Sequence, residues 1–135
     1  MTAFRTTRRV DFCDTDMAGI VHFSNFFRYM ETAEVAFLRE RGLSVKLGWE
    51  GHELGFPRVS ASCDYLKQVR FDDVLDIDVT LERVGGKSVT YRFDFSLQGS
   101  PVARGRVTSV CCAIGADGVL EGVEIPASLR ARLQA

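Results

Sequence analysis

The segment at residues 14–26, with the sequence DTDMAGIVHFSNF, combines residue types that could do chemistry. It holds two carboxylates, Asp14 and Asp16, and a glycine, Gly19, directly before a stretch with helical spacing. The free backbone N–H groups at a helix start, with the positive end of the helix dipole, can hold a developing oxyanion. A carboxylate beside them could attack a carbonyl or take a proton from water. The segment therefore predicts a site for acyl transfer.

The stretch after this segment is the longest predicted helix. Its apolar side chains recur every three or four residues and form one stripe, made of Phe23, Phe26, Phe27, Met30, Ala33, Phe37 and Leu38. Ser24 or Asn25 is placed to cap its start, and Gly42 to end it. We interpret the phenylalanines of the stripe as core residues, and Glu31 and Glu34 as surface or interface charges.

Alternation of polar and apolar residues predicts strands on both sides of the helix. The polar first segment, residues 4–12, indicates an edge strand. Half-buried strands are predicted at residues 59–66, 75–82 and 88–97, and a strand that is apolar on both faces at residues 107–114. The stretch up to Pro57, with its three glycines, is interpreted as a loop with one short helical turn. The residues around Leu129 suggest one or two helical turns at the C-terminal end.

This order of elements predicts an α+β architecture, with one long helix wrapped by a curved antiparallel sheet of about five strands. One helix covers only one face of such a sheet. The other face, and the two-sided apolar strand near Val110, therefore predict contact with another chain, in a homodimer or a higher oligomer. The chain has 135 residues and no linker or repeat, so we expect residues 1–135 to form a single domain.

Composition excludes several classes of function. The chain has 17 Lys and Arg against 18 Asp and Glu, and this balance predicts no binding to nucleic acid or to an acidic membrane. Apolar residues never run on for about 18 positions, and the first residues lack the apolar stretch of a signal peptide. We expect a soluble, cytoplasmic protein. The four cysteines form no CxxC pair, so we predict small buried thiols and no metal site.

The chemistry-bearing segment resembles a known family. The residues that carry the likeness are Asp14, Thr15, Asp16, Ala18, Gly19, Ile20, Val21, Phe23 and Asn25, followed by Arg28 and Tyr29 on the helix. They resemble the 4-hydroxybenzoyl-CoA thioesterase family. The motif extends from about Arg8 to Arg41, and a looser likeness includes residues 60–65, 71–78 and 87–88. The resemblance implies the hotdog fold and hydrolysis of an acyl-CoA thioester to a free acid and CoA.

The resemblance also implies roles for single residues. Asp16 matches the catalytic aspartate, and the backbone N–H of Phe23 matches the amide that polarises the thioester carbonyl. The position of Asp14 is better explained by local hydrogen bonding within a turn. The family likeness further assigns substrate binding to Gly19, His22, Ser60, Lys87 and Ser88, with Lys87 against the CoA phosphates. It implies no metal and no redox cofactor, since CoA is part of the substrate, and a homotetramer as one assembly.

One departure from the family concerns the acyl group. Short-chain acyl-CoA members often carry a histidine seven positions after the catalytic aspartate, where this chain has Phe23. His22 stands one position earlier, so we expect its imidazole to line the acyl pocket or to make a hydrogen bond rather than to act on the carbonyl. Aromatic or longer acyl groups are therefore at least as well supported as short ones.

Several alternatives stay open from the sequence. Taken alone, Asp16 is explained by a turn or a helix cap. Lys87 is equally well a solvated hairpin lysine, and Arg104 and Arg106 are either exposed charges or a polar floor for CoA. The same site could serve an acyl-carrier-protein thioesterase, or a hotdog hydratase or dehydratase that uses His22 and an acid. A noncatalytic acyl-CoA-binding protein is the alternative outside the enzymes.

Overall fold

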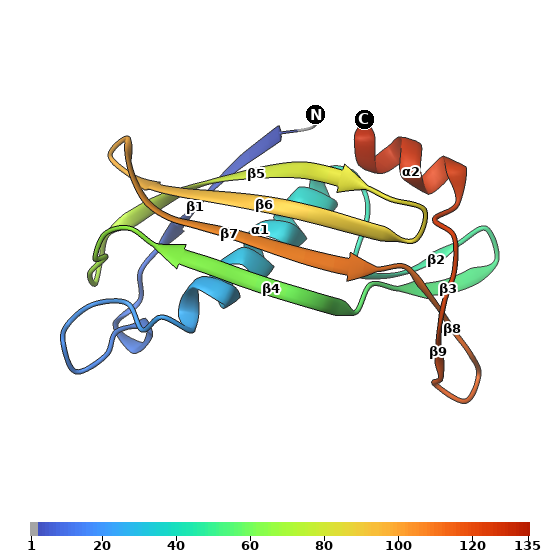
Figure 1. Cartoon of the computed structure of the whole chain (residues 1–135), viewed down its shortest axis with the longest axis horizontal. Coiled ribbons are helices and arrows are strands. Elements are labelled where there is room, and N and C mark those ends of the chain that lie inside the picture. Colours follow the sequence, from blue (N-terminus) through green and yellow to red (C-terminus); the bar gives the residue numbers. More distant parts are fainter. Residues whose placement is uncertain (1–2) are drawn as a thin grey trace.

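The computed structural model describes residues 3–135, and its main feature is a long helix packed across one face of an antiparallel sheet (Figure 1). The helix is α1 (Asn25–Glu40). The sheet has five strands in the spatial order β1 (Ala3–Arg9), β5 (Val74–Val84), β6 (Ser88–Leu97), β7 (Ser100–Val110) and β4 (Arg58–Tyr65). The predicted α+β architecture is confirmed, and β1 lies at an edge of the sheet, as its polar sequence indicated.

The packing of α1 follows from its apolar stripe. Its buried residues are Phe26, Tyr29, Met30, Ala33, Glu34, Phe37 and Leu38. Phe26 meets Phe95 of β6 edge to face at 5.3 Å between ring centroids. A Cβ atom at Gly105 of β7 would overlap Met30, so this glycine allows the helix to approach the sheet closely. The helix ends where predicted, because Gly42 takes the left-handed conformation with φ of 70°.

The two faces of the sheet differ in polarity. Side chains alternate along β6, with Val89, Tyr91, Phe93 and Phe95 buried against α1. The outer face carries ion pairs between Arg5 and Asp78, Arg104 and Asp94, and Arg106 and Glu82. Arg104 and Arg106 are therefore exposed charges with carboxylate partners. Because this face is polar, it gives no hydrophobic reason for contact with another chain, and the expected contact stays a prediction.

A second sheet corrects the predicted loop before Pro57. It contains β2 (Lys46–Trp49), β3 (His52–Gly55), β8 (Cys112–Ile114) and β9 (Leu120–Gly122), in that spatial order. The two residues between β2 and β3, Glu50 and Gly51, both have positive φ, of 50° and 81°. Two such residues form the tight turn that joins antiparallel strands, so the glycine-rich stretch is a hairpin and not a loop.

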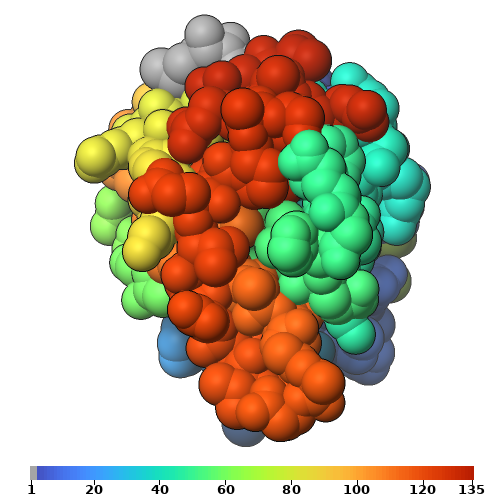
Figure 2. Space-filling model, turned by 90° about the vertical axis from the view of Figure 1, so that its right-hand side faces the viewer, coloured from blue at the N-terminus to red at the C-terminus, as the bar shows by residue number. Residues whose placement is uncertain are grey.

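The C-terminal segment and the β2–β3 hairpin both lie at the end of the molecule that faces the viewer in Figure 2. Helix α2 (Ala127–Gln134) buries Leu129 and Leu133, and it lies beside the β2–β3 hairpin in the space-filling view (Figure 2). The predicted one or two helical turns are confirmed. The description of one long helix and about five strands was incomplete, since it omitted α2 as a formed helix and the whole second sheet.

The predicted strand at residues 107–114 is divided in two. Strand β7 ends at Val110 and β8 begins at Cys112, while the Cys111 N–H donates to the backbone oxygen of Lys87.

All four cysteines are free; Cys111 and Cys112 are buried as predicted, but Cys13 is exposed. Across residues 3–135, the helices fall short of the length and apolar character that crossing a membrane requires.

Candidate active site

The connection between β1 and α1 is an ordered loop with a tight turn at its centre. After a short 3₁₀ helix (Phe12–Asp14), the Asp16 N–H donates to the Ile20 oxygen at 2.8 Å, and the Gly19 N–H donates to the Asp16 oxygen at 3.0 Å. Gly19 has φ of 80°, a conformation that side chains disfavour. Gly19 therefore serves the turn that presents the Asp16 carboxylate.

The Asp16 carboxylate is held by one oxygen only. Oδ1 accepts hydrogen bonds from the N–H groups of Ala18 at 2.8 Å and Ile20 at 3.5 Å. Within residues 3–135, Oδ2 takes part in no hydrogen bond and no ion pair. The turn thus orients the carboxylate and leaves one oxygen available to a substrate or a water.

The backbone around Phe23 presents a free donor. The His22 oxygen accepts from the Asn25 N–H at 2.9 Å, and the trans peptide points the Phe23 N–H in the opposite direction. No hydrogen bond in the described part of the chain uses that N–H. The Tyr65 hydroxyl of β4 donates to the Phe23 oxygen at 2.9 Å and fixes the residue from its other side.

Asp16 and Phe23 meet at one cavity of about 380 Å³. The cavity is lined by Asp16, Ile20, Val21, Phe23, Phe26, Tyr65, Leu66, Lys67, Gln68 and Val69. The Val21 N–H donates to the Val69 oxygen at 2.7 Å, so the loop and the segment after β4 are joined along the cavity. A carboxylate, a free backbone donor and a mostly apolar wall are groups that can support acyl transfer.

The sequence did not single out the wall formed by residues 65–69. Tyr65 is the last residue of β4, and residues 66–69 lie between β4 and β5; the segment combines Tyr65 and Leu66 with Lys67 and Gln68. The only sequence signal was their place between two strand patterns, because their approach to Val21 depends on tertiary contacts.

His22 lies outside the cavity wall. Its side chain is exposed, its Nδ1 lies 2.8 Å from the Ser24 Oγ, and its ring stacks on that of Phe23 at 4.6 Å between centroids. The structure thus places His22 in a hydrogen bond at the start of the helix, beside Phe23 and not among the residues that line the cavity.

The remaining predicted substrate-binding residues lie away from this cavity within one chain. Ser60 is exposed on β4, toward the end opposite Tyr65. Lys87 and Ser88 lie at the β5–β6 turn, at the other end of the sheet from the loop that carries Asp16 (Figure 1). A strand the length of β6 spans roughly 30 Å at about 3.3 Å per residue, so Lys87 of the same chain does not reach the cavity.

Comparison with known proteins places the chain among thioesterases. The model of the Thioesterase-like superfamily matches residues 10–133. The chain is 33% identical over 109 residues to a putative esterase of Aquifex aeolicus (strain VF5), covering 79% of this chain and 81% of that protein. It is 31% identical over 94 residues to the 4-hydroxybenzoyl-CoA thioesterase of Pseudomonas sp. (strain CBS-3), covering 66% and 64%.

The fold comparison agrees with these sequence matches. The structure superposes on the crystal structure of a 1,4-dihydroxy-2-naphthoyl-CoA thioesterase from Synechocystis with a TM-score of 0.84. The superposition covers 98% of this chain and 96% of the other, at 22% sequence identity. At that identity the likeness concerns the fold.

Proposed function

Because this chain belongs to the Thioesterase-like superfamily, we propose that it hydrolyses an acyl-CoA thioester to a free carboxylic acid and CoA. The resemblance to the 4-hydroxybenzoyl-CoA thioesterase family is confirmed, and the chain is a thioester hydrolase with the hotdog fold. The observation that carries the finer proposal is the shared cavity of Asp16 and Phe23. Both residues line it, and one Asp16 carboxylate oxygen and the Phe23 N–H have no hydrogen-bond partner in the described chain.

The proposed mechanism uses these two groups. The thioester carbonyl oxygen accepts a hydrogen bond from the Phe23 N–H, where the start of α1 also favours negative charge. In one route the Asp16 carboxylate attacks the carbonyl carbon, the C–S bond breaks, CoA leaves as a thiolate that takes a proton, and water hydrolyses the resulting anhydride. In the other route Asp16 takes a proton from water, whose oxygen attacks the carbonyl carbon; the C–S bond then breaks, and CoA leaves as a thiolate that takes a proton. Both routes use only protein groups and water.

Single turnover in ¹⁸O-labelled water distinguishes direct attack by water from attack by Asp16 in which water then opens the anhydride at the Asp16 carbonyl carbon. Direct attack by water puts one labelled oxygen into the product acid in the first turnover. An unlabelled product acid, with the label found in the Asp16 carboxylate, identifies attack by Asp16 and excludes the simple general-base route.

We propose an aromatic acyl group as the substrate class. Three rings, those of Phe23, Phe26 and Tyr65, line the cavity, and the wall is otherwise largely aliphatic. Its volume of about 380 Å³ falls in the range of small-molecule sites, roughly 300 to 1,000 Å³. The Pseudomonas relative, named for 4-hydroxybenzoyl-CoA, supports the same class.

Free-thiol release from a panel of thioesters tests this assignment. We expect the highest kcat/KM with benzoyl-type CoA esters, lower values with short-chain and long-chain acyl-CoA, and weak competition by acyl carrier protein. Faster release from an acylated carrier protein would favour a carrier-protein thioesterase. Saturable binding of all these esters without thiol release would favour a noncatalytic binding protein and overturn the proposal.

A hydratase or dehydratase is disfavoured by the position of His22. That chemistry needs a histidine and an acid on the same substrate, whereas His22 is bonded to Ser24 and does not line the cavity with Asp16. We expect His22→Ala to retain thioester hydrolysis. Loss of all turnover in this variant, with its fold intact, would revive the hydratase hypothesis.

We also propose that the chain acts as a homo-oligomer. Strand β4 is a sheet edge whose side chains are mostly exposed, including Val59 and Tyr65. Antiparallel pairing of β4 with a second copy would bring the far end of the partner's sheet toward this cavity, and with it Lys87 and Ser88 for the CoA portion. Light scattering should give a multiple of the 15.0 kDa chain mass, and a mass of one chain would contradict the proposal.

A further inference from the structure

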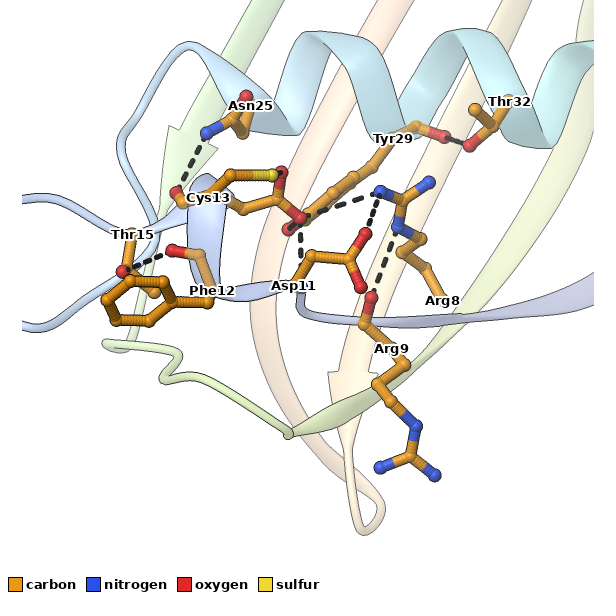
Figure 3. Close-up of polar contacts among 10 residues, drawn as sticks. Arg8, Arg9, Asp11, Phe12, Cys13, Thr15, Asn25, Tyr29 and Thr32 are labelled. Atoms are coloured by element: carbon orange, nitrogen blue, oxygen red, sulfur yellow. Dashed lines mark hydrogen bonds and ion pairs between the residues drawn. The ribbon is translucent and has the colours of Figure 1, made fainter.

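A polar cluster with a buried centre lies beside the cavity and takes no part in the proposed chemistry. We name it the Asp14 cluster, and it consists of Arg8, Asp11, Asp14, Asn25 and Tyr29 (Figure 3). Asp14 is 8% exposed and Tyr29 is 1% exposed. Neither residue lines the cavity, so neither side chain is placed to touch the substrate.

The Asp14 carboxylate receives donors from three parts of the chain. Its Oδ2 accepts from the Tyr29 hydroxyl of α1 at 2.8 Å and from the Asp11 N–H at 3.0 Å. Arg8, at the end of β1, lies 3.5 Å from the same oxygen, and its guanidinium stands 4.9 Å from the centre of the Tyr29 ring. These contacts fix Asp14 against both the first strand and the helix.

The backbone oxygen of Asp14 holds the far end of the loop. It accepts from the His22 N–H at 2.9 Å and from the Asn25 side-chain amide at 2.8 Å. The loop that carries Asp16 is thus closed at a single residue. Asp16 lies two positions after the Asp14 anchor, and Phe23 lies between the two groups that Asp14 binds.

We propose that Asp14 and Tyr29 are positioning residues, which set the Asp16 carboxylate and the Phe23 N–H at the mutual geometry that thioester hydrolysis needs. This inference rests on the proposed function of the cavity. Misplacement of reacting groups by about 1 Å can lower a rate by about 100-fold, and the loss falls on kcat when substrate contacts are kept. The two residues act through the backbone of the loop.

The test compares Tyr29→Phe and Asp14→Asn with a matched control, Tyr91→Phe. Tyr91 is a buried tyrosine of β6 that packs against Phe37, near the other end of α1, and its hydroxyl makes no hydrogen bond within residues 3–135. We expect kcat to fall by about 10-fold in Tyr29→Phe and about 100-fold in Asp14→Asn, with KM within about twofold of wild type. Tyr91→Phe should keep both constants.

Amide hydrogen exchange at His22 gives a second readout that needs no activity. Both cluster variants should speed exchange of the His22 N–H, and Tyr91→Phe should not. Unchanged kcat and unchanged exchange in Tyr29→Phe would overturn the inference, and this variant decides it even if Asp14→Asn fails to fold. If wild type hydrolyses no thioester, the proposed function fails, whereas the exchange data still decide whether the cluster holds the loop.

Discussion

Two buried carboxylates, one just before α1 and one within it, have pKa values that shift in opposite directions. Asp14 stands before α1 at 8% exposure, and Glu34 stands in its middle at 2% exposure. Each contacts an arginine, Arg8 at 3.5 Å and Arg58 at 2.6 Å. Yet the pKa of Asp14 is lowered from its usual value and the pKa of Glu34 is raised.

Depth of burial and the number of hydrogen-bond donors together explain the difference. Burial raises the pKa of Asp14. The hydrogen bonds from the Tyr29 hydroxyl and the Asp11 N–H, together with the charge of Arg8, outweigh burial, and the net effect is a lowered pKa. Burial also raises the pKa of Glu34, and there the single partner Arg58 offsets only part of the effect. An arginine at short range therefore does not by itself cancel the effect of burial on the pKa of a carboxylate. The loop that carries Asp16 is anchored at Asp14, which is the carboxylate with the larger number of hydrogen-bond donors.

Truncation of the two carboxylates should give the largest difference between these regions. Asp14→Ala leaves the Tyr29 hydroxyl and the Asp11 N–H without their partner, so we expect a loss of about 3 kcal/mol in the free energy of unfolding. Glu34→Ala releases Arg58, whose side chain is 33% exposed and can reach water, so its loss should be smaller. Urea denaturation measures both, and an equal or larger loss for Glu34→Ala would contradict the comparison.

Removal of single hydroxyl groups should give an intermediate effect. Tyr29→Phe deletes one hydrogen bond to an ionised carboxylate, which is worth about 1.5 to 3 kcal/mol of stability. Tyr91→Phe deletes a hydroxyl without a hydrogen bond inside the described chain and should change stability by less than about 1 kcal/mol. Thermal and urea denaturation of the two variants check this order. A greater loss of stability in Tyr91→Phe than in Tyr29→Phe would contradict it.

The two carboxylates should also respond to pH with opposite sign. Because the folded pKa of Asp14 is lowered, its stabilising contribution is complete above about pH 4 and is lost as the pH falls through the folded value. The folded pKa of Glu34 is raised, so its contribution is complete below about pH 4 and is lost as the pH rises through the folded value.

Non-titrating variants measure these two signs. The stability difference between wild type and Asp14→Asn should shrink as the pH falls below about 4. The difference between wild type and Glu34→Gln should shrink as the pH rises above about 4. The groups around the first carboxylate are Arg8, Asp11, Cys13 and Tyr29, and those around the second are Glu31, Arg58 and Tyr91. Parallel pH profiles for the two variants would refute the assignment.

Removal of an exposed ion pair should give the smallest loss of stability among these variants. Asp78 binds Arg5 on the outer face of the sheet through two contacts of 2.7 and 2.8 Å, but both side chains are exposed to water. We expect Asp78→Asn to leave kcat unchanged and to shift the urea midpoint only slightly, with a shift that decreases as salt is added. A midpoint shift as large as that of Tyr29→Phe would show that burial is not the deciding factor.

The regular elements could be predicted from the sequence because local spacing determined them. The apolar stripe of α1 and the alternation along β5 and β6 match the observed buried faces. The β2–β3 hairpin was missed because its glycines indicated a loop. Glu34 was interpreted as a surface or interface charge, although it follows Met30 by four residues on the buried stripe. Its partner, Arg58, is distant in the sequence, so local spacing could not reveal the pair.

The candidate site divides in the same way. The motif identified Asp16 and Phe23, because both belong to one short segment whose turn and helix start are local features. The wall at residues 65–69 depends on contact between the loop and the end of β4, which no local pattern encodes. Lys87 and Ser88 are far from the cavity within one chain, so their predicted role with CoA requires a second copy and stays a prediction.

The most direct test of the central claim is free-thiol release from benzoyl-type CoA esters by wild type, Asp16→Asn and the control Asp72→Asn. Asp72 is an exposed carboxylate 3.7 Å from Arg9 and does not line the cavity. We predict that Asp16→Asn loses about 10² to 10⁴ in kcat with an unchanged unfolding midpoint, while Asp72→Asn keeps the activity of wild type. Equal turnover by wild type and Asp16→Asn would contradict the assignment of this cavity as the active site.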